Sequence, residues 1–155
     1  MIYEFCAENV TLLEKAMQAG ARRIELCDNL AVGGTTPSYG VTKAAVELAA
    51  DYDTTIMTMI RPRGGDFFYN DLEISIMLED IRLTAQAGSQ GVVFGALTAD
   101  KKLDKANLEK LIAASKGMEI VFHMAFDDLS DQDQLEAIDW LSQAGVTRIL
   151  TRAGV

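Results

Sequence analysis

Thiol and carboxylate side chains stand close together along two apolar segments of this sequence. Cys6 ends one segment, and Cys27 ends the next, with Glu25 two residues before it. Side chains alternate between the two faces of a strand, so Glu25 and Cys27 share a face. A face that carries a glutamate is poorly suited to packing under helices, and we expect it to point into the interior of a barrel.

The two cysteines are candidate ligands for a soft metal ion. Thiolates with thioethers nearby suit Cu(I), and Met57 and Met59 lie on a later apolar segment. We therefore identify Cys6 and Cys27 as candidate copper ligands. The alternative is that both cysteines are small core residues and the methionines fill gaps, because C-x-x-C spacing is lacking.

A segment rich in arginine and glycine, Arg61–Phe67, follows the apolar run at 55–60. Glycine lets the backbone approach a ligand closely, and the planar guanidinium of arginine matches oxyanions. The candidate contacts to an anionic ligand are Arg61, Arg63, Gly64 and Gly65. The alternative for Arg61 is an ion pair with Glu25 or Glu4 inside the barrel.

A loop at 28–40 is rich in glycine and hydroxyl side chains and leads into a predicted helix. Backbone N–H groups and hydroxyls at such a position can bind a phosphate or a carboxylate. The candidate contacts are Asp28, Thr35 and Ser38. The alternative is a well-capped turn that Pro37 stiffens.

A histidine and an aspartate lie close together after the apolar segment at 119–123. A histidine at the end of a barrel strand can act as a general acid or base. The candidate catalytic residues are therefore His123, with Asp127 or Glu25 to orient it. The alternative is that His123 is a core residue with its hydrogen bonds satisfied.

Composition narrows the class of protein. The 155 residues are 49% hydrophobic and 24% charged, which is typical of one globular domain. The net charge is −9 without a basic cluster, so we expect no nucleic-acid partner. No apolar run reaches the roughly 20 residues of a membrane span, so we expect no membrane partner.

The cysteine and histidine counts limit the metal chemistry and the compartment. Two cysteines are too few for a disulfide framework, which predicts reduced thiols and a cytoplasmic location. His123 is the one histidine, which excludes a zinc site of several histidines within one chain.

A repeated strand–helix unit must position these residues. Gln-Ala-Gly occurs at 18–20, 86–88 and 143–145, each time after a helical pattern and before an apolar strand, and glycine is the expected helix stop. The predicted strands are 2–6, 23–27, 55–60, 91–95, 119–123 and 148–151. The predicted helices are 10–19, 39–50, 70–87, 104–115 and 131–144. Asn70 and Glu73 form a predicted capping box at the third helix.

Alternating strands and helices predict an α/β fold with a parallel sheet. A doubly wound sheet fits the length, but no G-x-G-x-x-G follows the first strand. Polar residues at the strand ends favour a TIM-like (βα) barrel, which typically needs about 250 residues. We therefore predict a single domain, 1–155, that is an incomplete barrel of about six strands and five helices.

Three long motifs resemble those of the CutC family, labelled copper homeostasis proteins. They are Glu25–Leu30 with Gly33–Gly40, Ile60–Phe67, and Phe122–Asp127, and the similarity extends along essentially the whole chain. The resemblance implies a TIM-like barrel in the cytoplasm, often oligomeric. It also implies Cu(I) handling, with Cys6 and Cys27 as the matching ligands.

Family chains are longer than this one, which ends just after the sixth predicted strand. The first and sixth strands would then be unclosed, and exposed edges invite pairing with another chain. We therefore expect either a fragment of a longer protein or a homo-oligomer that covers the opening.

Three functions are consistent with these residues. The first is a cytoplasmic copper homeostasis protein that binds Cu(I). The second is a barrel enzyme in which the arginines hold a small anionic, sugar-phosphate-like substrate and the histidine moves protons. The third is a non-catalytic scaffold whose strand-end charges satisfy one another. The sequence leaves open whether the protein is an enzyme.

Overall fold

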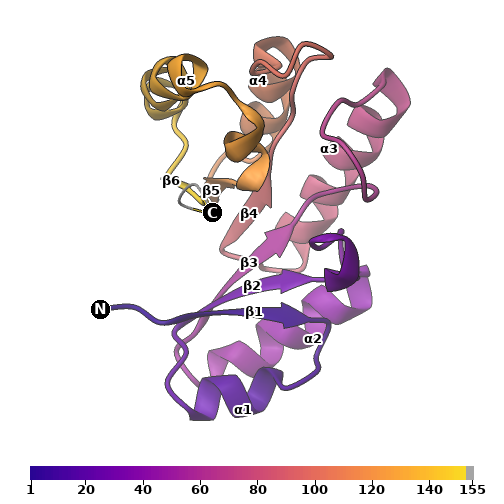
Figure 1. The fold of residues 1–155 in the computed structure, drawn as a ribbon. Coiled ribbons are helices and arrows are strands. Elements are labelled where there is room, and N and C mark those ends of the chain that lie inside the picture. Colours follow the sequence, from indigo (N-terminus) through magenta and orange to yellow (C-terminus); the bar gives the residue numbers. More distant parts are fainter. Residues whose placement is uncertain (153–155) are drawn as a thin grey trace.

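The structure is a computed structural model that describes residues 1–152 of the chain. Six parallel strands form one sheet in the order β1-β2-β3-β4-β5-β6 (Figure 1). The strands are β1 (Glu4–Glu8), β2 (Arg23–Cys27), β3 (Thr55–Met59), β4 (Gly91–Phe94), β5 (Glu119–Phe122) and β6 (Arg148–Ile149). Each strand pairs with the next one along the chain, and the sheet curves into a half-barrel.

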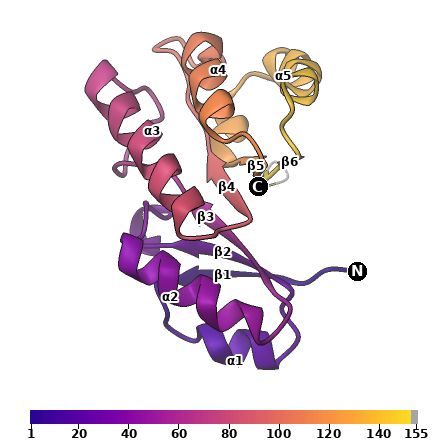
Figure 2. The same cartoon turned by 180° about the vertical axis from the view of Figure 1, so that it is seen from behind.

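Within residues 1–152, five α-helices connect the strands on the outer side of the sheet (Figure 2). They are α1 (Leu13–Gln18), α2 (Tyr39–Ala50), α3 (Asp71–Gln86), α4 (Lys105–Ala114) and α5 (Asp131–Ala144). Two 3-10 helices that were not predicted, η1 (Leu30–Val32) and η2 (Met124–Asp128), follow β2 and β5. The predicted α/β fold, an incomplete TIM-like barrel, is confirmed. No helix in this part of the chain is long and apolar enough to cross a membrane.

β1 and α1 begin later than predicted. β1 spans Glu4–Glu8 because its pairing with β2 extends to Glu8 opposite Cys27. Leu12 has a positive φ of 58°, and α1 begins only after it. Cys6 therefore lies in the middle of its strand, opposite Glu25 and two residues below the level of Cys27, and not at the carboxyl end.

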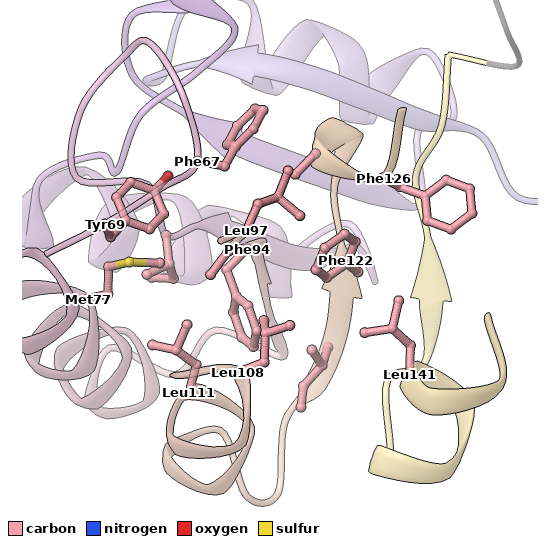
Figure 3. Close-up of a cluster of buried hydrophobic side chains, with 14 of the residues drawn as sticks. Phe67, Tyr69, Met77, Phe94, Leu97, Leu108, Leu111, Phe122, Phe126 and Leu141 are labelled. Atoms are coloured by element: carbon pink, nitrogen blue, oxygen red, sulfur yellow. The ribbon is translucent and has the colours of Figure 1, made fainter. Parts of the chain in front are cut away.

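The outer face of the sheet carries two apolar clusters that pack under the helices. Ile24, Leu26 and Ile56 pack with residues of α1 and α2. The second cluster lies under α3, α4 and α5, and Figure 3 shows its members Phe94, Phe122, Leu108, Leu111 and Leu141. Burying a side chain of this size contributes about 1.5–3 kcal/mol, so these clusters fix the strands in register.

The inner face of the sheet holds a separate buried cluster, as the alternation of side chains predicts. Its members are Cys27, Met57, Met59, Val93 and Val121. Gly91 lies beside Met57 in the β3–β4 register, and its missing side chain leaves room for the Met57 thioether. Cys27 therefore packs against thioether and aliphatic side chains of this cluster.

We expect Gly91→Ala to lower the free energy of unfolding by about 2 kcal/mol, because the added methyl overpacks the interior. The new Cβ would overlap the Met57 methyl and lie 2.8 Å from the Glu119 carbonyl oxygen. Urea unfolding would measure the change. Gly40→Ala is the matched control, since its Cβ would lie 3.9 Å from the nearest atom, Ser38 Oγ. The control should be neutral or up to about 1 kcal/mol more stable; equal effects of the two variants would contradict this packing.

Candidate functional site

Three residues form the uppermost inward-facing layer at the carboxyl ends of β3, β4 and β5. Arg61, Gly95 and His123 each continue the inward parity of their strands. A side chain at Gly95 would place its Cβ only 2.6 Å from Cε1 of His123, so the imidazole fills the space that the glycine leaves. Glycine at this position therefore lets the histidine lie across the sheet.

The guanidinium of Arg61 is held by backbone carbonyls. The residue is 3% exposed; Nη1 donates to the carbonyls of Val32 (2.6 Å) and Gly34 (3.0 Å), and Nη2 donates to that of Gly65 (2.8 Å). Gly64 packs against the Val32 side chain. Arg61 therefore joins the loop after β2 to the loop after β3. An ion pair between Arg61 and a glutamate of the barrel is absent among the described residues.

Cys6, Glu25 and Cys27 form a group that we call the thiol–carboxylate group. One ligand atom of each residue lies within 4.8 Å of the other two. The Cys27 thiol donates to Glu25 Oε1 over 3.6 Å, and the Cys6 thiol does so over 3.9 Å. Cys27 is buried and Cys6 is exposed, so the group is accessible from the β1 side. The structure thus brings together the two predicted copper ligands and the glutamate.

Burial and mutual contact shift the pKa values of this group. Burial raises the pKa of Glu25 above its ordinary value of 4.5, and the charge of Glu4 adds to the effect. The contact with Cys27 lowers the pKa of Cys6, whereas the same contact, together with burial, raises that of Cys27. Cys6 therefore ionises first, and a thiolate is the form that binds metals.

His123 is fully buried and neutral. Burial, reinforced by the positive charge of Arg61, lowers its pKa to about 3. Nδ1 accepts a hydrogen bond from the backbone N–H of Ala125 over 3.1 Å, so the proton of the neutral ring lies on Nε2. The Phe67 ring packs on the imidazole with centroids 4.9 Å apart. His123 is therefore a hydrogen-bond donor at neutral pH.

Asp127 lies beside residues that follow β6 rather than beside the imidazole. Its carboxylate accepts hydrogen bonds from the Thr151 hydroxyl and, over 2.9 Å, from the backbone N–H of Arg152. Within residues 1–152, neither Asp127 nor Glu25 hydrogen-bonds to His123. The structure does not bring the predicted acid–base residues into contact, and their catalytic roles stay predictions.

Arg63 binds carboxylates of its own loop and helix. Nε donates to Glu73, and Nη2 donates to Asp66 over 3.1 Å. Glu73 also forms the predicted capping box with Asn70 at the start of α3. The guanidinium that was predicted to be free for an anion therefore stabilises the loop after β3.

The predicted anion contacts of the loop after β2 also hold that loop together. Asp28 and Thr35 pair through their backbones, with N–H to carbonyl distances of 2.9 and 2.8 Å. Ser38 caps α2, because its Oγ accepts from the N–H of Val41 over 3.2 Å. The capped-turn alternative accounts for these contacts, and the ligand roles of the three residues stay predictions.

Two aromatic residues belong to this region although neither was a predicted site residue. Cζ of Arg61 lies 5.0 Å from the centroid of the Phe67 ring, and Cζ of Arg63 lies 5.1 Å from that of Tyr69. Both are cation–π contacts. In each contact the aromatic residue follows the arginine by six residues. This repeated spacing is a sequence signal that could have predicted the two contacts.

Comparison with known proteins matches residues 1–155 to the CutC family. A CutC family protein of Enterococcus faecalis is 54% identical over 154 residues, which are 99% of this chain and 74% of that protein. The solved structure of the Streptococcus agalactiae protein CutC, named for copper homeostasis, is 48% identical with a TM-score of 0.96, over 100% of this chain and 74% of that one. A Burkholderia cenocepacia structure described as a phosphonomutase has 19% identity and a TM-score of 0.70, over 97% of this chain and 62% of that one, and shows the fold alone.

Glu25→Gln should stabilise the protein increasingly as the pH rises. The raised pKa of Glu25 means that the folded state favours the neutral carboxyl. Protonated Glu25 therefore contributes to the free energy of unfolding of the wild type fully below about pH 4.5, and this contribution is lost as the pH rises through the folded pKa. Glutamine stays neutral throughout. Each tenfold difference in proton affinity of Glu25 between the folded and unfolded states changes the free energy of unfolding by about 1.4 kcal/mol.

Urea unfolding of both proteins at pH 4.5 and pH 8 would measure this difference. Glu47→Gln is the control, because Glu47 is an exposed residue of α2, and it removes the same charge from a site outside the barrel interior. A Glu25→Gln variant whose stability relative to the wild type is the same at both pH values would show that Glu25 titrates normally.

Proposed function

The chain belongs to the CutC family, and from this premise we propose that it binds Cu(I) as a copper homeostasis protein. The observation that carries the proposal is the thiol–carboxylate group, in which Cys6, Glu25 and Cys27 converge within 4.8 Å. Two sulfur ligands match the preference of Cu(I) for thiolates. Glu25 is a third, harder ligand at the same point.

The spacing of the ligand atoms supports binding without a rearrangement of the strands. Sulfur atoms lie about 2.3 Å from a bound ion such as Zn²⁺, so two ligands of one ion stand at most about 4.6 Å apart. The Sγ to Oε1 distances of 3.6 and 3.9 Å already lie within that limit. All three ligand atoms lie within 4.8 Å of one another, so a slight adjustment of the side chains would bring them to one ion.

The surroundings of Cys27 support a soft ion over a hydrated one. Its neighbours in the inner cluster include Met57 and Met59, and Cβ of a side chain at Gly34 would stand 3.0 Å from its Sγ. The backbone of the loop after β2 therefore shields this thiol. An ion bound there would enter and leave the site past the exposed Cys6. Such access suits a protein that takes up and releases copper.

The cellular setting and the assembly are part of the same proposal. Both cysteines are free thiols, as a copper-binding role in the reducing cytoplasm requires. β1 and β6 are the two edges of the sheet, and unpaired edge groups can pair with another chain. We propose that these edges are covered either by a further copy of the protein or, where the chain is a fragment of a longer protein, by the strands of the remaining part.

The acid–base enzyme is less well supported. A general base works best when its pKa lies near the operating pH, whereas that of His123 is about 3. Asp127 is bonded to Thr151 and Arg152. Copper binding therefore remains the function that the geometry favours.

Cys6→Ser should weaken Cu(I) binding by at least about 100-fold, because changes in the outer shell of a metal site already cost 10- to 100-fold. Cys6 is exposed, so this variant should keep its fold. Competition with a coloured Cu(I) chelator under anaerobic conditions would measure the affinity. Cys6→Ser/Cys27→Ser should leave no competing site.

Met57→Leu is the matched control, because it removes a thioether of the same inner cluster and keeps both thiols. Its affinity should stay within about tenfold of the wild type, since methionine and leucine have similar volumes. Wild-type affinity in the double cysteine variant would refute the thiol site.

A further inference from the structure

Three buried polar atoms within residues 1–152 have no hydrogen-bond partner. They are Nε of Arg61, the hydroxyl of Tyr69 and Nε2 of His123. A buried polar group that lacks a partner costs free energy, and native proteins contain few of them. Three in one region of a small chain therefore require an explanation.

Two of the three residues, Arg61 and His123, flank one aromatic ring, and the third, Tyr69, interacts with Arg61. The guanidinium of Arg61 and the imidazole of His123 lie 5.0 and 4.9 Å from the centroid of Phe67. The Tyr69 hydroxyl points to the side on which Phe67 lies (Figure 3), and the charge of Arg61 acts on that hydroxyl. The Phe67 ring therefore lies beside both Arg61 and His123, on the side toward which the Tyr69 hydroxyl is directed (Figure 3).

All three groups can donate a hydrogen bond. His123 carries its proton on Nε2, because Nδ1 accepts from Ala125. Arg61 Nε is an N–H of a permanent cation, and the tyrosine hydroxyl donates when it meets an acceptor. We call these three atoms the donor site. An occupant with lone pairs would satisfy each of them, which an aromatic ring does only weakly.

We propose that the donor site binds a small carboxylate, which takes the place of the Phe67 ring. The two oxygens of a carboxylate can accept all three hydrogen bonds. Two cations lie near the site, but Arg63 is paired with the carboxylates of Glu73 and Asp66. The one positive charge without a carboxylate partner is that of Arg61, which matches a monoanion rather than a doubly charged phosphate. The site is distinct from the thiol–carboxylate group and does not depend on copper.

Rotation of one side chain is sufficient to open the donor site. The backbone around Phe67 is fixed, because its carbonyl accepts from the N–H of Leu97 over 2.9 Å and Arg61 binds the carbonyl of Gly65. The Phe67 side chain is buried, with 8% of the residue exposed, and rotation of this one ring toward the solvent would open the donor site. A ligand can therefore enter from solvent without displacement of the loop.

The single histidine allows a direct test with formate as the probe. In Phe67→Ala, long-range ¹H–¹⁵N spectra should show the His123 Nε2 resonance shifting as formate is added, with an affinity at least about tenfold above that of the wild type. Phe68→Ala is the matched control, because Phe68 is the adjacent residue and is 51% exposed. It should bind formate as the wild type does. Adding Tyr69→Phe to Phe67→Ala should weaken binding about tenfold, the effect of one lost hydrogen bond.

Circular dichroism would first establish that each variant is folded. Should Phe67→Ala fail to fold, Phe67→Leu carries the same expectations with a smaller change in volume. A folded variant whose His123 resonances do not shift when formate is added would overturn the proposal. A buried water would then be the partner of the three donors. Equal affinity in Phe68→Ala and Phe67→Ala would overturn the role of the Phe67 ring, and tighter binding of inorganic phosphate than of formate would overturn the assignment to a carboxylate.

Discussion

The buried guanidinium of Arg61 is the constraint on which the strand-end region depends. A charge removed from water is costly unless it is fully hydrogen-bonded, and here three backbone carbonyls from two loops accept its Nη protons. The partial negative charge of the carbonyl oxygens stabilises the guanidinium, and unlike a carboxylate partner these neutral groups add no second ion that must be desolvated. Both loops are consequently fixed relative to β3. If either loop moved, the guanidinium would be exposed to solvent or would lose hydrogen bonds while still buried.

The loops fixed in this way shape two chemically different regions. On one side, the loop after β2 brings the Gly34 backbone against the Cys27 sulfur and encloses the thiol–carboxylate group. On the other side, the loop after β3 places Phe67 between Arg61 and His123. A soft ion suits the first region, and a hard, hydrogen-bonding acceptor suits the second. Arg61 thus organises the region of the thiol–carboxylate group from outside.

Periodicity and parity predicted most of the fold and the inward direction of the thiols. Strand parity identified Glu25 and Cys27 as inward-facing because alternation is a local property of the backbone. The start of β1 was not predictable in the same way, since it depends on pairing with β2. Two thiols with thioethers nearby indicated Cu(I) as a candidate ligand, and the family resemblance implied the same ion.

The partners of the charged groups could not be predicted from the sequence. Arg61 binds carbonyls of residues 27 to 29 positions earlier, and backbone atoms carry no sequence signal. Arg63 was expected to meet a ligand, but the carboxylate of the α3 capping box lies within its reach. Phe67 has no titratable or hydrogen-bonding side-chain group, so its sequence position alone does not mark it as a site residue. Its position between two buried donors emerges only when three strand ends come together.

Both thiols of the thiol–carboxylate group are proposed to hold one Cu(I) ion, and X-ray absorption at the copper edge can identify the atoms bound to that ion. Wild-type protein loaded with one equivalent of Cu(I) should show two sulfur neighbours and one lighter neighbour from Glu25 in the first shell of the copper. A first shell of nitrogen and oxygen atoms alone, or of a single sulfur, would contradict the account.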